Sequence, residues 1–116
     1  MPREILKRAL SIKQPIPELI LTGDKTEEYR RKRTHILERV YLYASKKCHK
    51  DFPDVTEEIA AQLPRGVIVG SVAIVGCRED EEEEGCFVWE LADPIRYSKP
   101  LVPKGVPQPG FWHPTF

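Results

Sequence analysis

The chain has 116 residues, 41% of them hydrophobic, and its 18 basic residues are balanced by 18 acidic ones. This length predicts a single domain over residues 1–116 with a modest core, while zero net charge excludes a global attraction to nucleic acid or membranes, so that any binding of RNA depends on a local patch. The apolar runs are too short to span a bilayer, and the first ten residues lack the apolar core of a signal peptide, so we expect a cytoplasmic protein without membrane contact.

The first half of the chain predicts strands around one short helix. Ile16, Leu19 and Ile20 have the spacing of an amphipathic helix, which Gly23 ends. Farther on, apolar and aromatic residues alternate as they do in a half-buried strand. The expected elements are a strand at residues 6–13, a helix at 15–22, a strand at 25–31 and a strand at 36–45.

The second half predicts another helix and a larger number of extended segments. Asp54 starts a capping box for the helix, and Gly70 interrupts a β-branched run, as a bulge or a barrel corner does. Five prolines between residues 94 and 109 favour an edge strand and an extended connection over a central strand. The expected elements are a helix at residues 54–63, a strand at 67–77, an acidic loop at 78–84, a strand at 86–91, an edge strand and connection at 94–109, and an aromatic end at 110–116 that folds back over the core or over one wall of a cleft.

The order of these elements, without a repeated strand–helix–strand unit, predicts an α+β protein. We expect a small β-barrel of about five to six mostly antiparallel strands with two short flanking helices. The cysteines Cys48, Cys77 and Cys86 are odd in number and form no C-x-x-C pair. This pattern predicts reduced thiols and no metal site.

The string GDKTEEYR at residues 23–30 is the densest cluster of charge next to an apolar helix. In an extended segment, Glu28 and Arg30 share one face, so both side chains can enter one cleft, with Lys25 near its mouth. The alternative is that Glu28 and Arg30 form a structural ion pair. Spacing alone leaves both interpretations open.

Eight short motifs follow one another along the chain: LSIKQP at residues 10–15, ELI at 18–20, GDKTEEYR at 23–30, YASKK at 43–47, LPRGVIVGSV at 63–72, FVWEL at 87–91, PIR at 94–96 and GFW at 110–112. In this order they resemble the ASCH domain family, the activating-signal-cointegrator homology family of the PUA-like superfamily. The resemblance implies a PUA-like β-barrel in which the first helix and the strand after it line a cleft for a nucleobase or nucleotide.

The resemblance also implies roles for individual residues. Lys25 and Arg30 would contact phosphate or a base edge, Glu28 would accept from an exocyclic amine, and Tyr29 or Trp89 could stack on a base. Each of two residues has an alternative role that is the more common one for its type: Trp89 as a core residue, and Ser45 as a turn cap and not a phosphate ligand. The candidate ligand-binding residues are Lys13, Lys25, Glu28, Arg30, Ser45, Lys46, Lys47 and Trp89.

Three functions fit these residues. The first is binding of RNA or a nucleotide-like molecule, in RNA metabolism or in the regulation of translation or transcription. The second is hydrolysis with Lys25 and Glu28 as catalytic residues, either of RNA with a divalent metal or of N4-acetylcytidine; some relatives cleave that nucleoside with Lys, Thr and Glu, but Glu28 replaces the threonine here. The third is a protein-interaction module with protein partners.

Overall fold

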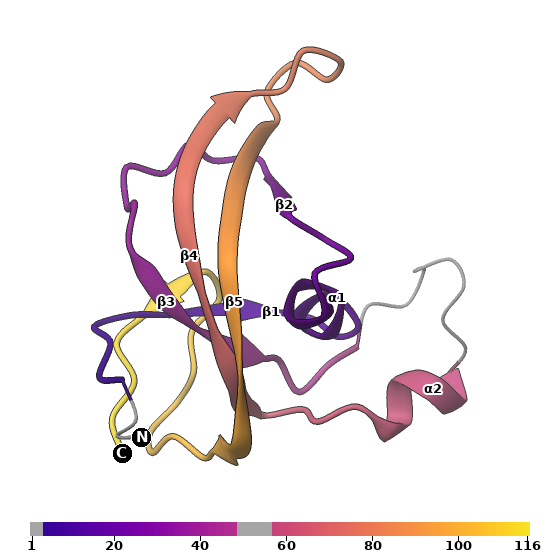
Figure 1. Ribbon diagram of the computed structural model, residues 1–116, viewed down its shortest axis with the longest axis vertical. Coiled ribbons are helices and arrows are strands. Elements are labelled where there is room, and N and C mark those ends of the chain that lie inside the picture. The colour runs from indigo at the N-terminus through magenta and orange to yellow at the C-terminus, as the bar shows by residue number, and fades with distance from the viewer. Residues whose placement is uncertain (1–3, 49–56) are drawn as a thin grey trace.

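The computed structural model describes residues 4–48 and 57–116. Within these ranges six strands form one sheet in the order β2-β5-β4-β3-β1-β6 (Figure 1). The β1–β3 pair is parallel and the other pairs are antiparallel. The elements are β1 (Ala9–Ile12), α1 (Ile16–Thr22), β2 (Glu27–Arg30), β3 (Arg39–Ala44), α2 (Glu57–Gln62), β4 (Val67–Glu79), β5 (Phe87–Leu101) and β6 (Phe111–Trp112).

The sheet is a curved half-barrel, because β2 and β6 are its two ends and no ladder joins them in the described part of the chain. Figure 1 shows the long strands β4 and β5 bending along the length of the molecule. The predicted α+β class and the mostly antiparallel strands are confirmed. The predicted barrel is present as this open form.

Strand β5 departs from the sequence prediction, which separated a strand at residues 86–91 from an edge segment beginning at Pro94. The structure has one continuous strand, Phe87–Leu101. Pro94 and Pro100 fit within it because β2 pairs only with residues 87–90, which leaves the rest of that edge without a neighbouring strand. Prolines at an unpaired edge interrupt no ladder hydrogen bond.

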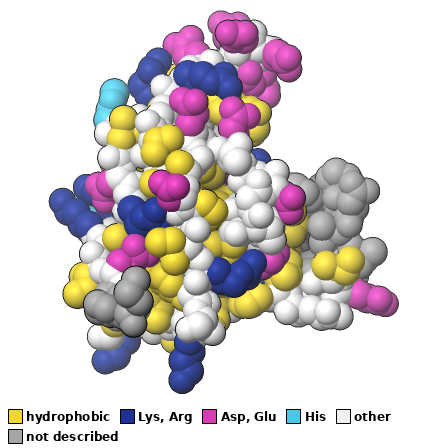
Figure 2. Space-filling view, viewed as in Figure 1, with side chains coloured by type: hydrophobic (Ala, Val, Ile, Leu, Met, Phe, Trp, Pro, Cys, Tyr) yellow, Lys and Arg dark blue, Asp and Glu magenta, His cyan; other side chains and the backbone are white. Residues whose placement is uncertain are grey.

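The acidic loop is shorter than the predicted residues 78–84, because Arg78 and Glu79 still belong to β4. The remaining acidic side chains gather at the tip of the β4–β5 hairpin, together with basic side chains (Figure 2). Exposed ion pairs join this end of the hairpin to the segment after β2: the loop residue Glu83 pairs with Arg31 at 2.7 Å, and Glu79 at the end of β4 pairs with Arg33 at 3.1 Å. The loop is thus tied to the segment that follows β2.

Helix α1 packs on the sheet through Ile20, which is buried against β-strand residues. Gly23 ends the helix as predicted: its φ of 85° is left-handed, and its N–H donates to the Ile20 carbonyl at 3.1 Å. Contacts of α1 reach β3, β4 and β5. The helix therefore covers the sheet next to the point where β2 begins.

The prediction of two flanking helices is wrong, because within the described residues only α1 packs against the sheet. Helix α2 projects away from it (Figure 1), and its apolar residue Ile59 is half-exposed. The predicted helix start at Asp54 lies outside the described residues. No described helix is long and apolar enough to cross a membrane.

The two faces of β3 divide the core as the alternation in its sequence predicts. Val40 and Leu42 belong to one cluster with the helix residue Ile20, whereas Tyr41 and Tyr43 belong to a second cluster on the other face. Trp112 of β6 joins the second cluster and meets Tyr43 edge-on, with ring centroids 5.2 Å apart. The aromatic chain end thus folds back over the core, as expected.

Candidate functional site

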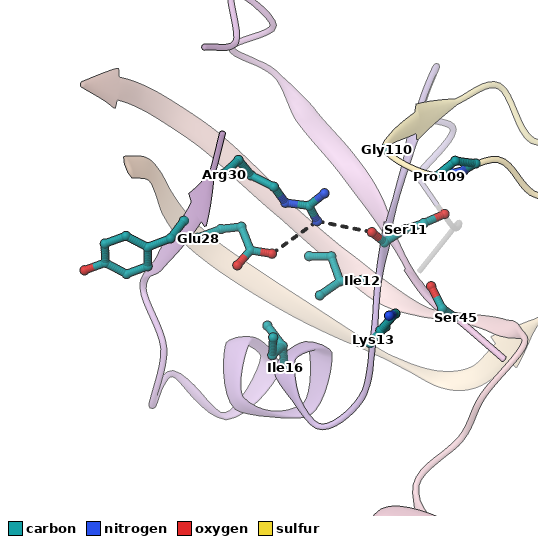
Figure 3. A pocket seen from close by; sticks show the side chains of 10 residues that line it. Ser11, Ile12, Lys13, Ile16, Glu28, Arg30, Ser45, Pro109 and Gly110 are labelled. Carbon is teal, nitrogen blue, oxygen red and sulfur yellow. Dashed lines mark hydrogen bonds and ion pairs between the residues drawn. The ribbon is translucent and has the colours of Figure 1, made fainter. Parts of the chain in front are cut away.

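The described residues enclose a cavity of about 360 Å³, which we call the first cavity. This volume is within the range of roughly 300–1,000 Å³ that is usual for small-molecule sites. The cavity opens between β2, the start of α1 and the ends of β1 and β3 (Figure 3). It is lined by Ser11, Ile12, Lys13, Ile16, Glu28, Tyr29, Arg30, Ser45, Pro109 and Gly110.

Glu28 and Arg30 extend from the same face of β2 into the first cavity (Figure 3). The Arg30 Nη2 atom lies 3.2 Å from Glu28 Oε2 and donates to the Ser11 carbonyl at 3.2 Å. The guanidinium also covers Trp89, 5.7 Å from its ring centroid. Arg30 therefore joins β2 to β1 across the open side of the half-barrel.

Lys25 lies on the other side of the Glu28 carboxylate. Its Nζ atom is 4.0 Å from Glu28 Oε1 and 5.3 Å from the centroid of the Tyr29 ring. Lys25 does not line the first cavity but borders a separate cavity of about 90 Å³. Glu28, with a side chain only 7% exposed, is thus placed between two cations that contact different oxygens.

Lys13 and Ser45 meet at the first cavity because they follow paired parallel strands. Ile12 of β1 pairs with Ala44 of β3, and the Ser45 N–H donates to the Ile12 carbonyl at 3.0 Å. Since parallel strands end at the same edge of a sheet, the next residue of each strand lies there. Lys13 is exposed, and it forms no ion pair with any described residue.

Buried Gln14 holds the chain in place beside Lys13. Its Nε2 atom donates to the Pro64 carbonyl at 2.8 Å, and its Oε1 atom accepts from the Glu18 N–H at 3.2 Å. These bonds connect the start of α1 to the segment before β4. The backbone at Lys13 is therefore positioned by a satisfied buried amide.

Besides Lys25, three predicted site residues lie outside the first cavity. Lys46 and Lys47 are exposed after the end of β3, and the Lys46 side chain lies beside Gly66. Trp89 is a core residue, only 5% exposed, with its indole N–H donating to the Lys32 carbonyl at 2.9 Å. Its ring stacks on Phe111, with centroids 5.4 Å apart.

Residues from distant parts of the sequence complete the first cavity, and sequence reasoning did not identify them. The Ser11 hydroxyl donates to the Gln108 carbonyl at 2.7 Å and accepts from the Trp112 indole N–H at 2.9 Å. These bonds hold Pro109 and Gly110 against β1 as one wall. The only sequence signal for this wall was the apolar chain end, which predicted a wall without naming its residues.

The electrostatics of the first cavity combine one carboxylate with two cations. Glu28 is the only carboxylate among its lining residues, which include Lys13 and Arg30. The exposed Tyr29 hydroxyl donates to Glu27 Oε1 at 3.1 Å, and this hydrogen bond raises the pKa of Tyr29. Lys13 and Arg30 thus offer hydrogen-bond donors to a polar ligand in the cavity, and the Glu28 carboxylate offers an acceptor.

A group of acidic and thiol ligands lies elsewhere. In the described part of the chain, the ligand atoms of Asp80, Glu83 and Cys86 lie within 4.8 Å of one another in the β4–β5 loop. None of these residues lines the first cavity. The residues of the first cavity therefore do not form a carboxylate cluster of the type that divalent cations prefer.

Replacing Glu28 with glutamine is expected to lower the free energy of unfolding by about 1–3 kcal/mol, since charge-assisted hydrogen bonds contribute more than neutral ones. The substitution keeps the shape of the side chain but removes the charge that Lys25 and Arg30 contact. Urea denaturation provides the measurement. The matched control is Glu83→Gln, whose pair with Arg31 is exposed and should cost under about 0.5 kcal/mol. Equal losses in both variants would contradict a buried structural role for Glu28.

Comparison with known proteins gives a consistent family and fold. The model of the ASCH domain matches residues 10–101. The crystal structure of ASCH from Zymomonas mobilis is similar, with a TM-score of 0.59 and 17% identity over 91% of this chain and 85% of that one. Structures of two mutants of that protein match with TM-scores of 0.58 and 0.57, at 17% and 16% identity over 91% of this chain and 86% and 88% of theirs. No curated protein matches this chain significantly.

Proposed function

Because this chain belongs to the ASCH domain family, we propose that it binds single-stranded RNA or a nucleotide-like molecule in the first cavity. The observation that carries the proposal is the combination of an exposed cation, Lys13, with the Glu28–Arg30 pair in one cavity of about 360 Å³. A nucleotide presents both an anion and a polar base edge, so this set of groups is complementary to it.

In this proposal each group binds a different part of the nucleotide. Lys13, which has no ion pair among the described residues, would bind the phosphate. Glu28 accepts hydrogen bonds and Arg30 donates them, so the two together suit a base edge that carries both an amine and a carbonyl. Ile12 and Ile16 supply an apolar surface beside the base. Lys25 acts through Glu28, because it does not line the cavity.

The direct test is fluorescence anisotropy with a labelled single-stranded RNA of random sequence. Lys13→Ala is expected to weaken binding about three- to tenfold and to reduce the slope of log K against log salt by about 0.7, the loss of one phosphate contact to a single strand. Lys99→Ala is the matched control, because Lys99 is exposed on β5. It lines neither the first cavity nor the adjoining cavity of about 750 Å³. Equal affinity of both variants for RNA would contradict the assignment of Lys13, and absence of any binding by the unmodified chain would overturn the proposal.

Hydrolysis is the second candidate, because Lys25 and Glu28 lie 4.0 Å apart beside the first cavity. A general base has to reach the proton that it removes, and Glu28 is the carboxylate that enters the cavity. Incubation with RNA or with N4-acetylcytidine, each with and without Mg²⁺, separates the candidates. Product that disappears in Glu28→Ala supports catalysis, and intact substrate with RNA bound supports a binding module. If neither occurs, a protein-interaction module is the remaining function.

We also propose a cytoplasmic location. Cys77 and Cys86 lie at the same end of the β4–β5 hairpin, and both are free thiols. Reduced thiols in a protein of this size are typical of a reducing compartment. Fractionation of cells with an antibody against the chain would test the location, and secretion of the chain into the medium would contradict it.

A further inference from the structure

A second cavity of about 750 Å³ lies beside the first among the described residues. The two cavities share Arg30, Pro109 and Gly110, so a ligand that leaves the first cavity past these residues enters the second. One side of the second cavity is formed by residues 30–36, which connect β2 to β3, and another side by Trp89 and Phe111. This space has no role in the binding of a single nucleotide described above.

The second cavity is strongly basic on the side of the connection. Residues 30–33 all carry positive charge and all line it, whereas no carboxylate of residues 4–48 and 57–116 does. Arg31 and Arg33 form exposed pairs with hairpin carboxylates, and such pairs stabilise a protein little, so a phosphate can replace them. Lys32 is exposed and has no ion pair with a described residue.

The position of Lys32 is fixed through its backbone. Its carbonyl accepts a hydrogen bond from the Trp89 indole at 2.9 Å, which attaches the connection to β5. The neighbouring Thr34 is buried, and its hydroxyl accepts from the Ile36 N–H at 3.0 Å. A charge on a segment held in this way is placed at a defined distance from the first cavity, as a phosphate site requires.

Aromatic rings line the same cavity. Phe111 stacks on Trp89 with an angle of 5° between the ring planes, and it remains partly exposed. Because Trp89 is buried, Phe111 is the ring that a ligand in the cavity can reach. Basic side chains around an aromatic surface are the usual composition of sites for single-stranded nucleic acid, where bases stack and phosphates meet cations.

We propose that the second cavity binds the adjoining nucleotide of the strand whose first nucleotide occupies the first cavity. Lys32 contacts its phosphate, Phe111 contacts its base, and Arg30 lies between the two nucleotides. This inference rests on the proposed function, and it specifies the ligand: a single strand of at least two nucleotides rather than a free nucleoside or mononucleotide.

The test compares two probes with two substitutions. The probes are a fluorescein-labelled hexaribonucleotide of random sequence and an equimolar mixture of the four ribonucleoside 5′-monophosphates, measured as competitor. The unmodified chain is expected to bind the hexanucleotide at least about tenfold more tightly, since stacking of one base contributes roughly that factor or more. Lys32→Ala and Phe111→Leu are expected to weaken hexanucleotide binding about three- to tenfold and to leave mononucleotide binding unchanged.

The outcomes separate this inference from the proposed function. Lys13→Ala should weaken the binding of both probes, because both place a nucleotide in the first cavity and Lys13 lines that cavity and not the second. If Lys32→Ala and Phe111→Leu bind the hexanucleotide like the unmodified chain, or if both probes bind the unmodified chain equally, the second cavity is not a nucleotide site while the first remains one. If neither probe binds the unmodified chain, both proposals are overturned. Lys32 is exposed, so its substitution tests the site even if Phe111→Leu impairs folding.

Discussion

Arg30→Ala is expected to weaken RNA binding about ten- to a hundredfold and to lower the free energy of unfolding by about 1–3 kcal/mol, because a charged side chain with several hydrogen bonds is removed. Arg30 contacts Glu28, the Ser11 carbonyl and the ring of Trp89, and it lines both cavities. Its loss leaves the buried Glu28 with Lys25 alone as a cationic partner. Fluorescence anisotropy measures the affinity, and urea denaturation measures the stability.

Two further substitutions separate charge from geometry at this position. Arg30→Lys keeps the charge but cannot reproduce the planar fork of donors, so it should bind RNA more weakly than the unmodified chain. Arg96→Ala is the matched control, since Arg96 forms an even closer pair with Glu18, at 2.7 Å, but lines neither cavity. RNA affinity that falls as far in Arg96→Ala as in Arg30→Ala would show that the effect is not specific to the cavities.

Gly70→Ala is expected to lower the free energy of unfolding by about 3 kcal/mol, the upper part of the usual range for overpacking, because the clash involves backbone atoms. A Cβ atom built at Gly70 would lie 2.2 Å from the Ile95 carbonyl oxygen and 2.9 Å from Leu21 Cδ2. Strand β4 changes register against β5 between Ile68 and Gly70, which is the bulge predicted from the sequence. Thermal and urea denaturation measure the loss.

The matched control for this prediction lies on the same strand. A Cβ atom at Gly76 would meet Glu90 Oε1 at 2.4 Å, but that atom is the end of a flexible side chain that can move away. Gly76→Ala should therefore cost far less than Gly70→Ala. If both variants unfold at the same urea concentration, close packing against Ile95 is not the reason for glycine at position 70.

The close packing around Gly70 also affects the shape of the first cavity. The clash would involve Leu21 of α1, and the first residue of the same helix, Ile16, lines the cavity. An α1 helix displaced from the sheet would move one wall away from Glu28 and Arg30. The small residue in β4 thus keeps the helix close enough for the cavity to have its present form.

Local patterns predicted the elements whose signals lie within a few residues. The alternation of Val40, Tyr41 and Leu42 gave the two faces of β3, and Gly23 marked the end of α1. The prolines after residue 93 led to the wrong prediction of a separate edge segment that begins at residue 94. The destabilising effect of a proline in a strand depends on whether a neighbouring strand is present. Only the sheet order shows that β2 leaves most of that edge of β5 unpaired.

The candidate site could be predicted in part, because the spacing of some of its residues along one strand determines how they lie. Glu28 and Arg30 are two residues apart on a strand, so the period of a strand places them together. Lys25 precedes the strand in a turn, where spacing does not determine direction, and the structure places it on the far side of Glu28. The indole ring of Trp89 is of the type that can stack on a base, but the side chain is buried and belongs to the core.

By itself, the sequence determined the family, the α+β class, the interruption of the strand at Gly70 and the shared face of Glu28 and Arg30, because each depends on short-range periodicity or on an ordered series of motifs. The tertiary structure alone decided that the barrel stays half-open, that α2 lies away from the sheet, and that Ser11, Pro109 and Gly110 complete the first cavity. These features arise from contacts between segments up to about a hundred residues apart, such as the Ser11–Trp112 hydrogen bond, and such contacts leave no local period in the chain.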